Sequence, residues 1–354
     1  MKTLDFNQWA VVAHKDDTGF GRQAGDIRKV LSVGRHIVIP SERLTDHPLD
    51  PLHEFPLSPK APESRVKEVL HGLQGIIFFE RPAWHPDLLR CARELGVATV
   101  CVPNWEWFRG GDKAWDNCDL FACPNQMALR TVRGFGRANS TYLPWCLDLD
   151  SLPVQLIQGH ARTFVHNAGL VDPDDRKGTR DTIEAFHRTR RKDIRLIVRL
   201  QKEVPLPKLD DRIDVQIGNV KSHAELYRNV DAAIQPSKME GIGFMILEAV
   251  CAGLPVITTD YPPMNEYVLQ PELRAQTQWW KRKAFPTPWV PHAHLRLPRK
   301  GDLVHRIEWC ADRDMEAISK QNRAWAEETF SADHLRRQWS EAFDARLFST
   351  GKRT

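Results

Sequence analysis

The chain has 354 residues, of which 42% are hydrophobic and 27% are charged, and its formal net charge is +4. These values exclude a disordered or fibrous protein, and the length suits two domains of about 150 to 200 residues each. No run approaches the roughly 18 apolar residues of a membrane span, and the first residues lack the pattern of a signal peptide, so a cytoplasmic protein is expected. The seven cysteines form no C-x-x-C pair, which favours reduced thiols.

Short apolar runs alternate with amphipathic stretches along the first half of the chain. Examples are WAVVAH at 9–14, GIIFFE at 75–80 and VATVCVP at 97–103, with stretches of helical spacing between them. Prolines and acidic residues at 143–154 indicate a linker, and the same alternation then resumes. Such alternation is typical of βαβ units and parallel sheets.

The sequence therefore predicts an α/β protein with two doubly wound, Rossmann-like domains, at 1–154 and 155–330. A C-terminal helix at 331–354 could cross back to the N-terminal domain. Ligands of such sheets bind beyond the carboxyl ends of the strands, so function is expected in a cleft between the domains.

The most informative stretch is QPSKMEGIGFMILEAVCAGLPVITTD at 235–260, which predicts a strand, a glycine loop, a helix and a second strand. Gly241 and Gly243 allow close approach to a ligand, and the first amides of the helix favour an anion there. Glu240 precedes the helix and Glu248 lies about two turns into it, roughly 9 Å along the axis. The two carboxylates could bracket a diphosphate, one facing a sugar and the other a ribose. Alternatively, Glu240 only caps the helix and Glu248 is solvated.

The spacing E-x7-E at 240–248, followed by A-x-x-x-G-x-P-V at 249–256, resembles retaining glycosyltransferases of the GT-B fold, particularly family 4. The resemblance implies retention at the anomeric carbon, with the leaving phosphate taking the proton of the acceptor. It also implies that Glu240 contacts the donor sugar, that the backbone of Gly241, Ile242, Gly243 and Phe244 contacts the diphosphate, and that Glu248 holds the ribose.

A basic pair near the start of the second domain grips the diphosphate in that family, and Arg176-Lys177 before Gly178 is the candidate here. The arginine that usually follows the first strand is missing, because His166 and Asn167 stand at that place. We expect Asn167 and Arg199, at the ends of two strands, to approach the same site. The alternatives are an exposed charge run for the pair and a surface position for Arg199.

Candidates in the first domain lie in loops that follow strands. The resemblance to GT-B enzymes implies that Gly19 and Gly21, in TGFGRQAG at 18–25, face the donor phosphates and the acceptor, although plain turn chemistry is the alternative. Glu106 is the preferred acceptor-side catalytic residue, because the acceptor hydroxyl must lose a proton. The other polar residues after strands are Glu80, Arg81, His85, Asn104 and Arg109.

The expected donor is a nucleoside-diphosphate sugar, with a UDP-sugar first, and neither a tightly bound cofactor nor a metal is expected. The acceptor stays open. The segment at 279–300 interleaves aromatic and basic residues, so hydroxymethylated pyrimidine in DNA is one candidate. A lipid, glycan or small molecule is another. A non-catalytic nucleotide-binding or nucleic-acid-binding protein and a nicotinamide dehydrogenase are the competing functions, and the oligomeric state is not predicted.

Overall fold

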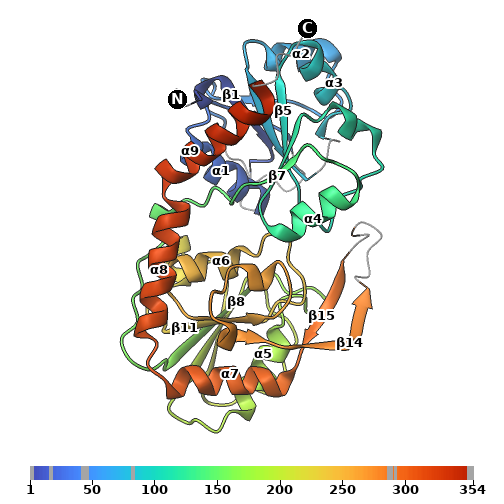
Figure 1. Cartoon of the computed structure of the whole chain (residues 1–354). Helices are drawn as coiled ribbons and strands as arrows, with labels where there is room; N and C mark the ends of the chain where they lie inside the picture. Colours follow the sequence, from blue (N-terminus) through green and yellow to red (C-terminus); the bar gives the residue numbers. More distant parts are fainter. Residues whose placement is uncertain are drawn as a thin grey trace. The chain divides into compact units, whose positions relative to one another are not determined.

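The computed structural model describes residues 4–15, 19–40, 48–80, 84–284, 290 and 293–348, without the side chains of 19, 20 and 279–284. The chain divides into two compact units (Figure 1). Unit 1 contains residues Met1–Asp148 and Phe330–Thr354, and unit 2 contains Leu149–Thr329.

Unit 1 is built on a seven-stranded parallel sheet in the order β3-β2-β1-β4-β5-β6-β7. Its strands are β1 (Trp9–Ala13), β2 (Arg35–Val38), β3 (Glu54–Pro56), β4 (Gly75–Phe79), β5 (Ala98–Val102), β6 (Leu120–Cys123) and β7 (Ser140–Tyr142). Its helices are α1 (Gly19–Leu31), α2 (Glu63–Leu70), α3 (Leu88–Glu94), α4 (Gln126–Gly134) and α9 (Ala332–Phe343). Every residue of β1, β4 and β5 is buried, as expected of central strands covered on both faces.

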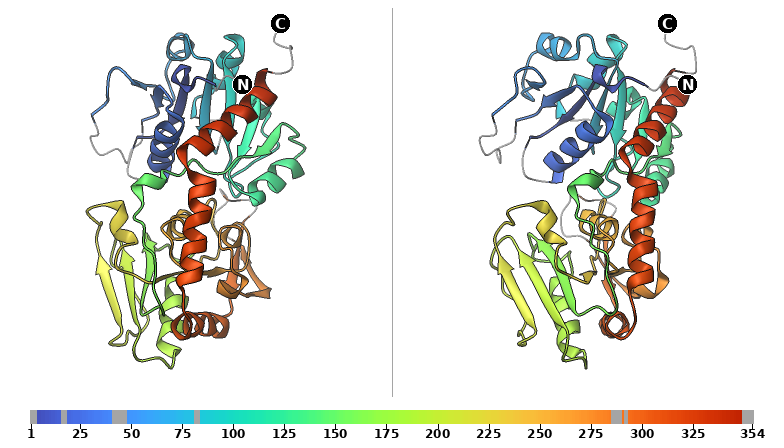
Figure 2. Two further views of the ribbon diagram at one scale, coloured as in Figure 1. Left: turned by 60° about the vertical axis from the view of Figure 1, so that its left-hand side comes forward. Right: turned by 90° about the vertical axis from the view of Figure 1, so that its left-hand side faces the viewer.

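Helix α9, close to the end of the chain, belongs to unit 1 and lies beside α1 (Figure 2). The Arg336 guanidinium donates to the Val30 carbonyl across 2.6 Å, and the Phe343 ring packs 4.8 Å from the Trp9 ring, centre to centre. The amphipathic face of this helix therefore completes the core of unit 1.

Unit 2 is built on a six-stranded parallel sheet in the order β10-β9-β8-β11-β12-β13. Its strands are β8 (Thr163–Gly169), β9 (Arg195–Leu200), β10 (Ile213–Ile217), β11 (Ala232–Gln235), β12 (Val256–Thr259) and β13 (Arg274–Ala275). Its helices are α5 (Thr179–Arg188), α6 (Phe244–Cys251), α7 (Lys300–Asp312) and α8 (Glu316–Phe330), and an antiparallel pair, β14 (Thr277–Ala284) and β15 (His294–Pro298), precedes α7.

Both sheets reverse direction at one point. The chain moves outward from β1 to β3 and then returns to β4, and likewise outward from β8 to β10 before returning to β11. Crossovers on the two sides of such a point place their helices on opposite faces and leave a crevice at the carboxyl ends of the two central strands. The prediction of an α/β chain with two doubly wound parallel sheets is confirmed.

Strand β3 forms in the proline-rich stretch that follows β2, because β2 supplies a parallel partner for its backbone. One local prediction differs from the structure. Helix α6 begins only at Phe244, because Gly243 adopts a left-handed conformation with φ of 87°. Glu248 therefore lies about one turn into the helix rather than two.

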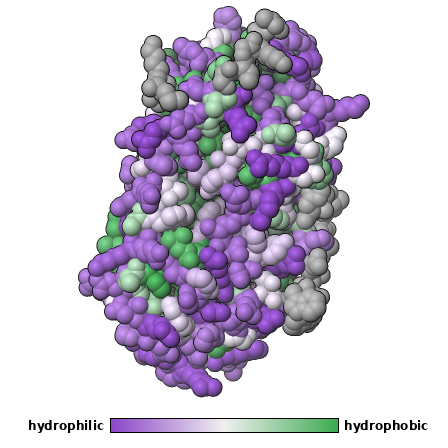
Figure 3. All heavy atoms as spheres, in the orientation of Figure 1, coloured by the Kyte–Doolittle hydropathy of each residue, from purple (hydrophilic) through white to green (hydrophobic). Residues whose placement is uncertain are grey.

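The face drawn in Figure 3 is largely hydrophilic, with scattered apolar side chains. Within the described part of the chain, no helix is both long and apolar enough to cross a bilayer. All seven cysteines are free and buried.

Candidate functional site

The loops after β8 and β11 meet at the reversal point of the sheet in unit 2. Strands β8 and β11 are hydrogen-bonded neighbours, so the segments that follow them leave the same edge side by side. Gly178, at the end of the first loop, has a φ of 74° and lies so close to Pro236 that a Cβ there would come within 2.5 Å of the Pro236 carbonyl oxygen. The approach of the two loops therefore requires glycine at this position.

This contact brings three of the predicted site residues together. The Arg176 guanidinium lies 2.8 Å from one carboxylate oxygen of Glu240, and the Lys177 ammonium lies 2.7 Å from the other. Glu240 is only 5% exposed, so its charge needs these partners. Glu240 is not the N-cap residue of α6, because Gly243 takes that position.

The charge state of the cluster follows from its surroundings. Burial raises the pKa of Glu240, but the charges of Lys177 and Arg176 outweigh that effect and bring the pKa down to about 2. Burial lowers the pKa of Lys177, which the Glu240 charge opposes. The carboxylate is therefore ionised at neutral pH and sits between two cations.

The backbone of the first loop is also fixed. The Arg176 amide donates to the Asp172 carboxylate across 3.2 Å, and the Arg176 carbonyl accepts from the Lys238 amide at 2.7 Å. The guanidinium of Arg176 donates to the Met239 carbonyl as well, across 2.9 Å. Contacts from both loops therefore hold Arg176 in place.

The predicted diphosphate-binding backbone lies directly after Glu240. Ile242 is 3% exposed and anchors the loop, whereas Gly241 and Phe244 are half-buried. The amides of Ile246 and Leu247 both donate to the Gly243 carbonyl, which closes the first turn of α6. A helix start beside two cations is a favourable place for an anion.

Glu248 lies on α6 and is fully buried, so the alternative of a solvated carboxylate is wrong. The same carboxylate oxygen accepts a hydrogen bond from Tyr227 at 2.6 Å and lies 2.7 Å from Nε2 of His223. Neither partner was among the residues singled out from the sequence. Their signal is only the general one that polar side chains collect in loops after strands.

Asn167 and Arg199 contact a neighbouring loop and not the Glu240 cluster. The Asn167 amide donates to the Leu226 carbonyl across 3.0 Å, and Arg199 donates to the same oxygen at 2.7 Å. These two side chains therefore fix the residue just before Tyr227, which in turn donates to Glu248.

His166 takes a structural position beneath the site. Its Nδ1 lies 2.7 Å from the Ile234 carbonyl, and its Nε2 lies 3.0 Å from the Thr179 hydroxyl. Burial lowers the pKa of His166 to about 4, so the ring is neutral. Because a carbonyl can only accept, Nδ1 carries the proton and Nε2 accepts from Thr179. The histidine joins β8, β11 and α5.

The candidates of unit 1 are spread over several contacts. Gly19 and Gly21 lie in the first turn of α1, and Glu106 is buried, with 6% of its surface exposed. Glu80, at a φ of 62°, accepts a short hydrogen bond from Asn104. His85 lies 2.9 Å from the Ala61 carbonyl.

Two of the predicted features lie wholly or partly outside the described residues. Arg81 and parts of 279–300 lie outside the described residues.

Among the described side chains, the group with metal-ligand spacing is Glu63, Cys91 and Glu94. Its two carboxylates pair with Arg90 and Lys67.

Part of the sequence of unit 2 matches a family model. Residues 161–276 match the family described as Glycosyl transferases group 1, a range that holds Arg176, Lys177, Glu240 and Glu248. A search among curated proteins finds no significant match to the sequence.

Solved structures resemble the chain over nearly its whole length. The lipopolysaccharide outer core galactosyltransferase WaaB is 13% identical, with a TM-score of 0.64 over 96% of this chain and 99% of that protein. HepE of Anabaena, solved with UDP and glucose, is 11% identical, with a TM-score of 0.67 over 95% and 99%. The fold is GT-B.

The GT-B fold is shared by proteins of more than one activity. A protein proposed to be a UDP-N-acetylglucosamine 2-epimerase, from Listeria monocytogenes, is 12% identical, with a TM-score of 0.56 over 95% of each chain. Fold alone therefore does not decide the reaction. The family match together with the GT-B fold supports a glycosyltransferase.

Proposed function

We propose that this chain transfers a sugar from a nucleoside-diphosphate donor to an acceptor hydroxyl, with retention of the anomeric configuration. The observation that carries the proposal is the convergence of Arg176 and Lys177 on the buried carboxylate of Glu240, beside the start of α6. The group 1 glycosyltransferase match over 161–276 supports it.

In this proposal the two cations bind the diphosphate of the donor. A lysine ammonium has three donors and a guanidinium has five, so both can serve the phosphates while keeping a contact to Glu240. Negative charge grows on the diphosphate as it leaves, and preorganised cations in a site with little water stabilise that charge by a few kcal/mol each.

Glu240 takes the role of orienting the donor sugar. Its ionised carboxylate accepts hydrogen bonds from sugar hydroxyls and lies next to the phosphate site. Glu248, fully buried below the loop, is proposed to hold the ribose together with its partners Tyr227 and His223.

The proposed reaction breaks the bond between the anomeric carbon and the phosphate oxygen and forms a bond from that carbon to the acceptor oxygen. The acceptor proton passes to the departing phosphate oxygen on the same face of the sugar. The donor is a substrate, and the reaction as proposed requires no separate cofactor or metal. Glu106 in unit 1 is proposed to act on the acceptor side.

A UDP-sugar is the first donor to test, because HepE binds UDP. Two acceptor classes are proposed. DNA with hydroxymethylated pyrimidine is supported by the basic and aromatic sequence at 279–300, and a glycan is supported by the substrate in the name of WaaB.

A screen of nucleotide release tests the proposal. UDP-, GDP- and ADP-sugars are each incubated with the protein and with hydroxymethylated DNA, an oligosaccharide or a lipid acceptor. We expect release with one donor and acceptor together, and little with Glu240→Ala. Binding without release by any pair would favour the non-catalytic alternative, and reduction of a nicotinamide cofactor would favour a dehydrogenase.

A further inference from the structure

Lys238 lies between the two loops of the donor site and is almost fully buried, with 7% of its surface exposed. Its ammonium lies 3.2 Å from the Asp175 carboxylate and 3.0 Å from the Asp181 carboxylate. Its position in the sequence, two residues before Glu240, belongs to the loop after β11, whereas both carboxylates come from the loop after β8 and the start of α5.

The same residue joins the loops through its backbone. The Lys238 amide donates to the Arg176 carbonyl across 2.7 Å, and the Lys238 carbonyl accepts from the Arg296 amide of β15 at 2.8 Å. Lys238 is therefore linked to the loop of Arg176 by both its backbone and its side chain.

Asp175 links Lys238 to the two cations of the site, Arg176 and Lys177. It has a left-handed φ of 51°, and its carboxylate accepts from the Thr179 amide at 2.7 Å and the Arg180 amide at 3.1 Å. Arg176 and Lys177 follow it directly, so the orientation of Asp175 sets how their backbone enters α5. A non-glycine residue at positive φ persists where its surroundings hold it.

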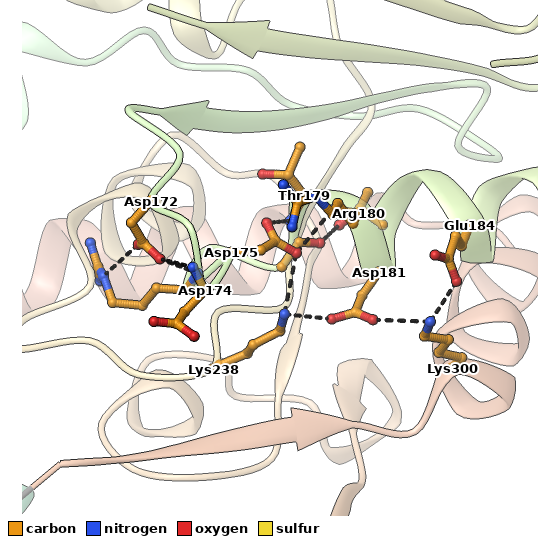
Figure 4. A network of polar contacts seen from close by, with 12 residues as sticks. Asp172, Asp174, Asp175, Thr179, Arg180, Asp181, Glu184, Lys238 and Lys300 are labelled. Atoms are coloured by element: carbon orange, nitrogen blue, oxygen red, sulfur yellow. Dashed lines mark hydrogen bonds and ion pairs between the residues drawn. The ribbon is translucent and has the colours of Figure 1, made fainter. Parts of the chain in front are cut away.

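The ion pairs extend one step further along α5, as Figure 4 shows. Lys300, at the start of α7, lies 3.5 Å from Asp181 and 2.5 Å from Glu184. Lys300 is more exposed than Lys238 and has no contact in this network with Asp175. Two lysines therefore lie close to the Asp181 carboxylate. Of these two, Lys238 also contacts Asp175, in the loop that contains Arg176 and Lys177.

We propose that Lys238 is a positioning residue of the donor site, which holds Arg176 and Lys177 in register with Glu240 so that they bind a diphosphate. Its ammonium does not itself touch the donor, because two carboxylates enclose it. This inference rests on the proposed function, since it concerns how the same site binds its nucleotide.

The test compares the same substitution at the two lysines. Wild-type protein is first titrated with UDP, GDP and ADP by calorimetry, and the tightest ligand is used with its monophosphate. We expect Lys238→Met to weaken diphosphate binding about tenfold or more, because displaced cations lose their geometry, and monophosphate binding much less. Lys300→Met should keep the diphosphate affinity within about twofold.

A double variant separates positioning from stability. Lys238→Met leaves the buried Asp175 carboxylate without its lysine and Asp181 with Lys300 alone, so two negative charges lose their shared cation, which can prevent folding. Lys238→Met combined with Asp181→Asn removes one of those charges, so thermal stability should recover while diphosphate affinity stays low. If the single variant does not fold, the double variant carries the comparison with Lys300→Met.

Three results would overturn the inference. These are wild-type diphosphate affinity in the folded Lys238 variants, recovery of affinity together with stability in the double variant, and an equal loss in Lys300→Met. If the wild type binds none of the three nucleotides, the proposed function fails and the inference fails with it. A defect confined to the Lys238 variants leaves the proposed function intact.

Discussion

At the scale of single residues, the balance of charge around Glu240 is the feature with the clearest consequences. One buried carboxylate is paired with two cations, so in the proposed reaction a donor diphosphate shares Arg176 and Lys177 with an internal anion. In that proposal the Glu240 carboxylate helps to orient the sugar but competes with the diphosphate for the two cations.

Glu240→Gln should separate the effect on the sugar from the effect on the diphosphate. We expect turnover to fall by about a hundredfold or more, because the ionised hydrogen-bond acceptor for the sugar is lost. Binding of the free nucleoside diphosphate should become about two- to tenfold tighter, because an opposing charge has been removed. Calorimetry and a nucleotide-release assay measure the two effects, with Glu316→Gln, at a glutamate paired with Lys320, as control. Weaker diphosphate binding would contradict the charge balance described here.

His166 predicts how stability depends on pH. Burial lowers the pKa of His166 from 6.5 to about 4. Between these two pH values the unfolded chain binds a proton at this residue and the folded chain does not. Stability from this group is thus complete above pH 6.5 and is lost as the pH falls towards 4, by up to about 3 kcal/mol. His36 in unit 1 has a similarly lowered pKa of about 4 and contributes in the same direction.

We therefore expect His166→Gln to be less stable than wild type at neutral pH but to lose less stability between pH 6.5 and 4. Urea unfolding at several pH values measures the slope. The exposed His71→Gln is the control and should leave the slope unchanged. A slope in His166→Gln as steep as that of the wild type would show that this histidine does not cause the acid sensitivity.

At the scale of elements, the close approach of the loops after β8 and β11 sets the geometry of the site. Gly178 permits it, because a side chain there would meet the Pro236 backbone. Gly159 has a similar φ of 79°, yet a Cβ added to it would meet nothing within 4 Å. The two glycines therefore share a left-handed backbone conformation but differ in what surrounds them.

Gly178→Ala should cost more than Gly159→Ala. Strain from positive φ costs about 1–2 kcal/mol in both variants. We expect about 1–3 kcal/mol more for Gly178→Ala, because a rigid carbonyl must move, and a marked loss of diphosphate affinity in that variant alone. Thermal unfolding and calorimetry give both quantities. Equal costs and unchanged nucleotide affinity would mean that the loop contact is unimportant.

The elements of the site were predicted from the sequence more fully than the contacts between them. The stretch at 235–260 has a strand, a glycine loop and a helix of its own, so its local structure can be predicted from neighbouring residues. The residue at which α6 begins could not be predicted in this way, because the φ angle of Gly243 depends on the geometry of the loop. The links of Lys238 to Asp175 and Asp181 join residues about 60 positions apart, and no local pattern indicates such pairs.

At the scale of the whole molecule, alternating strands and helices were sufficient to predict two parallel sheets. The order of the strands within each sheet could not be predicted in this way, because it depends on where the chain reverses direction. In unit 2 that reversal point brings Arg176, Lys177 and Glu240 together. Asn167 and Arg199 show the limit at the residue level. Both occupy strand ends as predicted, but side-chain direction turns them towards Leu226.

The GT-B fold leaves more than one reaction open, because proteins of this architecture include one proposed to be an epimerase. The two reactions differ in their products. A transferase releases the nucleoside diphosphate and needs an acceptor, whereas an epimerase changes the configuration of one sugar carbon.

Proton NMR of a donor sugar nucleotide incubated with the protein and an acceptor distinguishes these outcomes in one experiment. We predict that the anomeric signal of the donor is replaced by the anomeric signal of a glycoside of the same configuration. Free nucleoside diphosphate should appear at the same rate. Glu240→Gln should prevent both changes. Conversion of the donor to an epimer without acceptor, or no consumption of any UDP-, GDP- or ADP-sugar, would contradict the account.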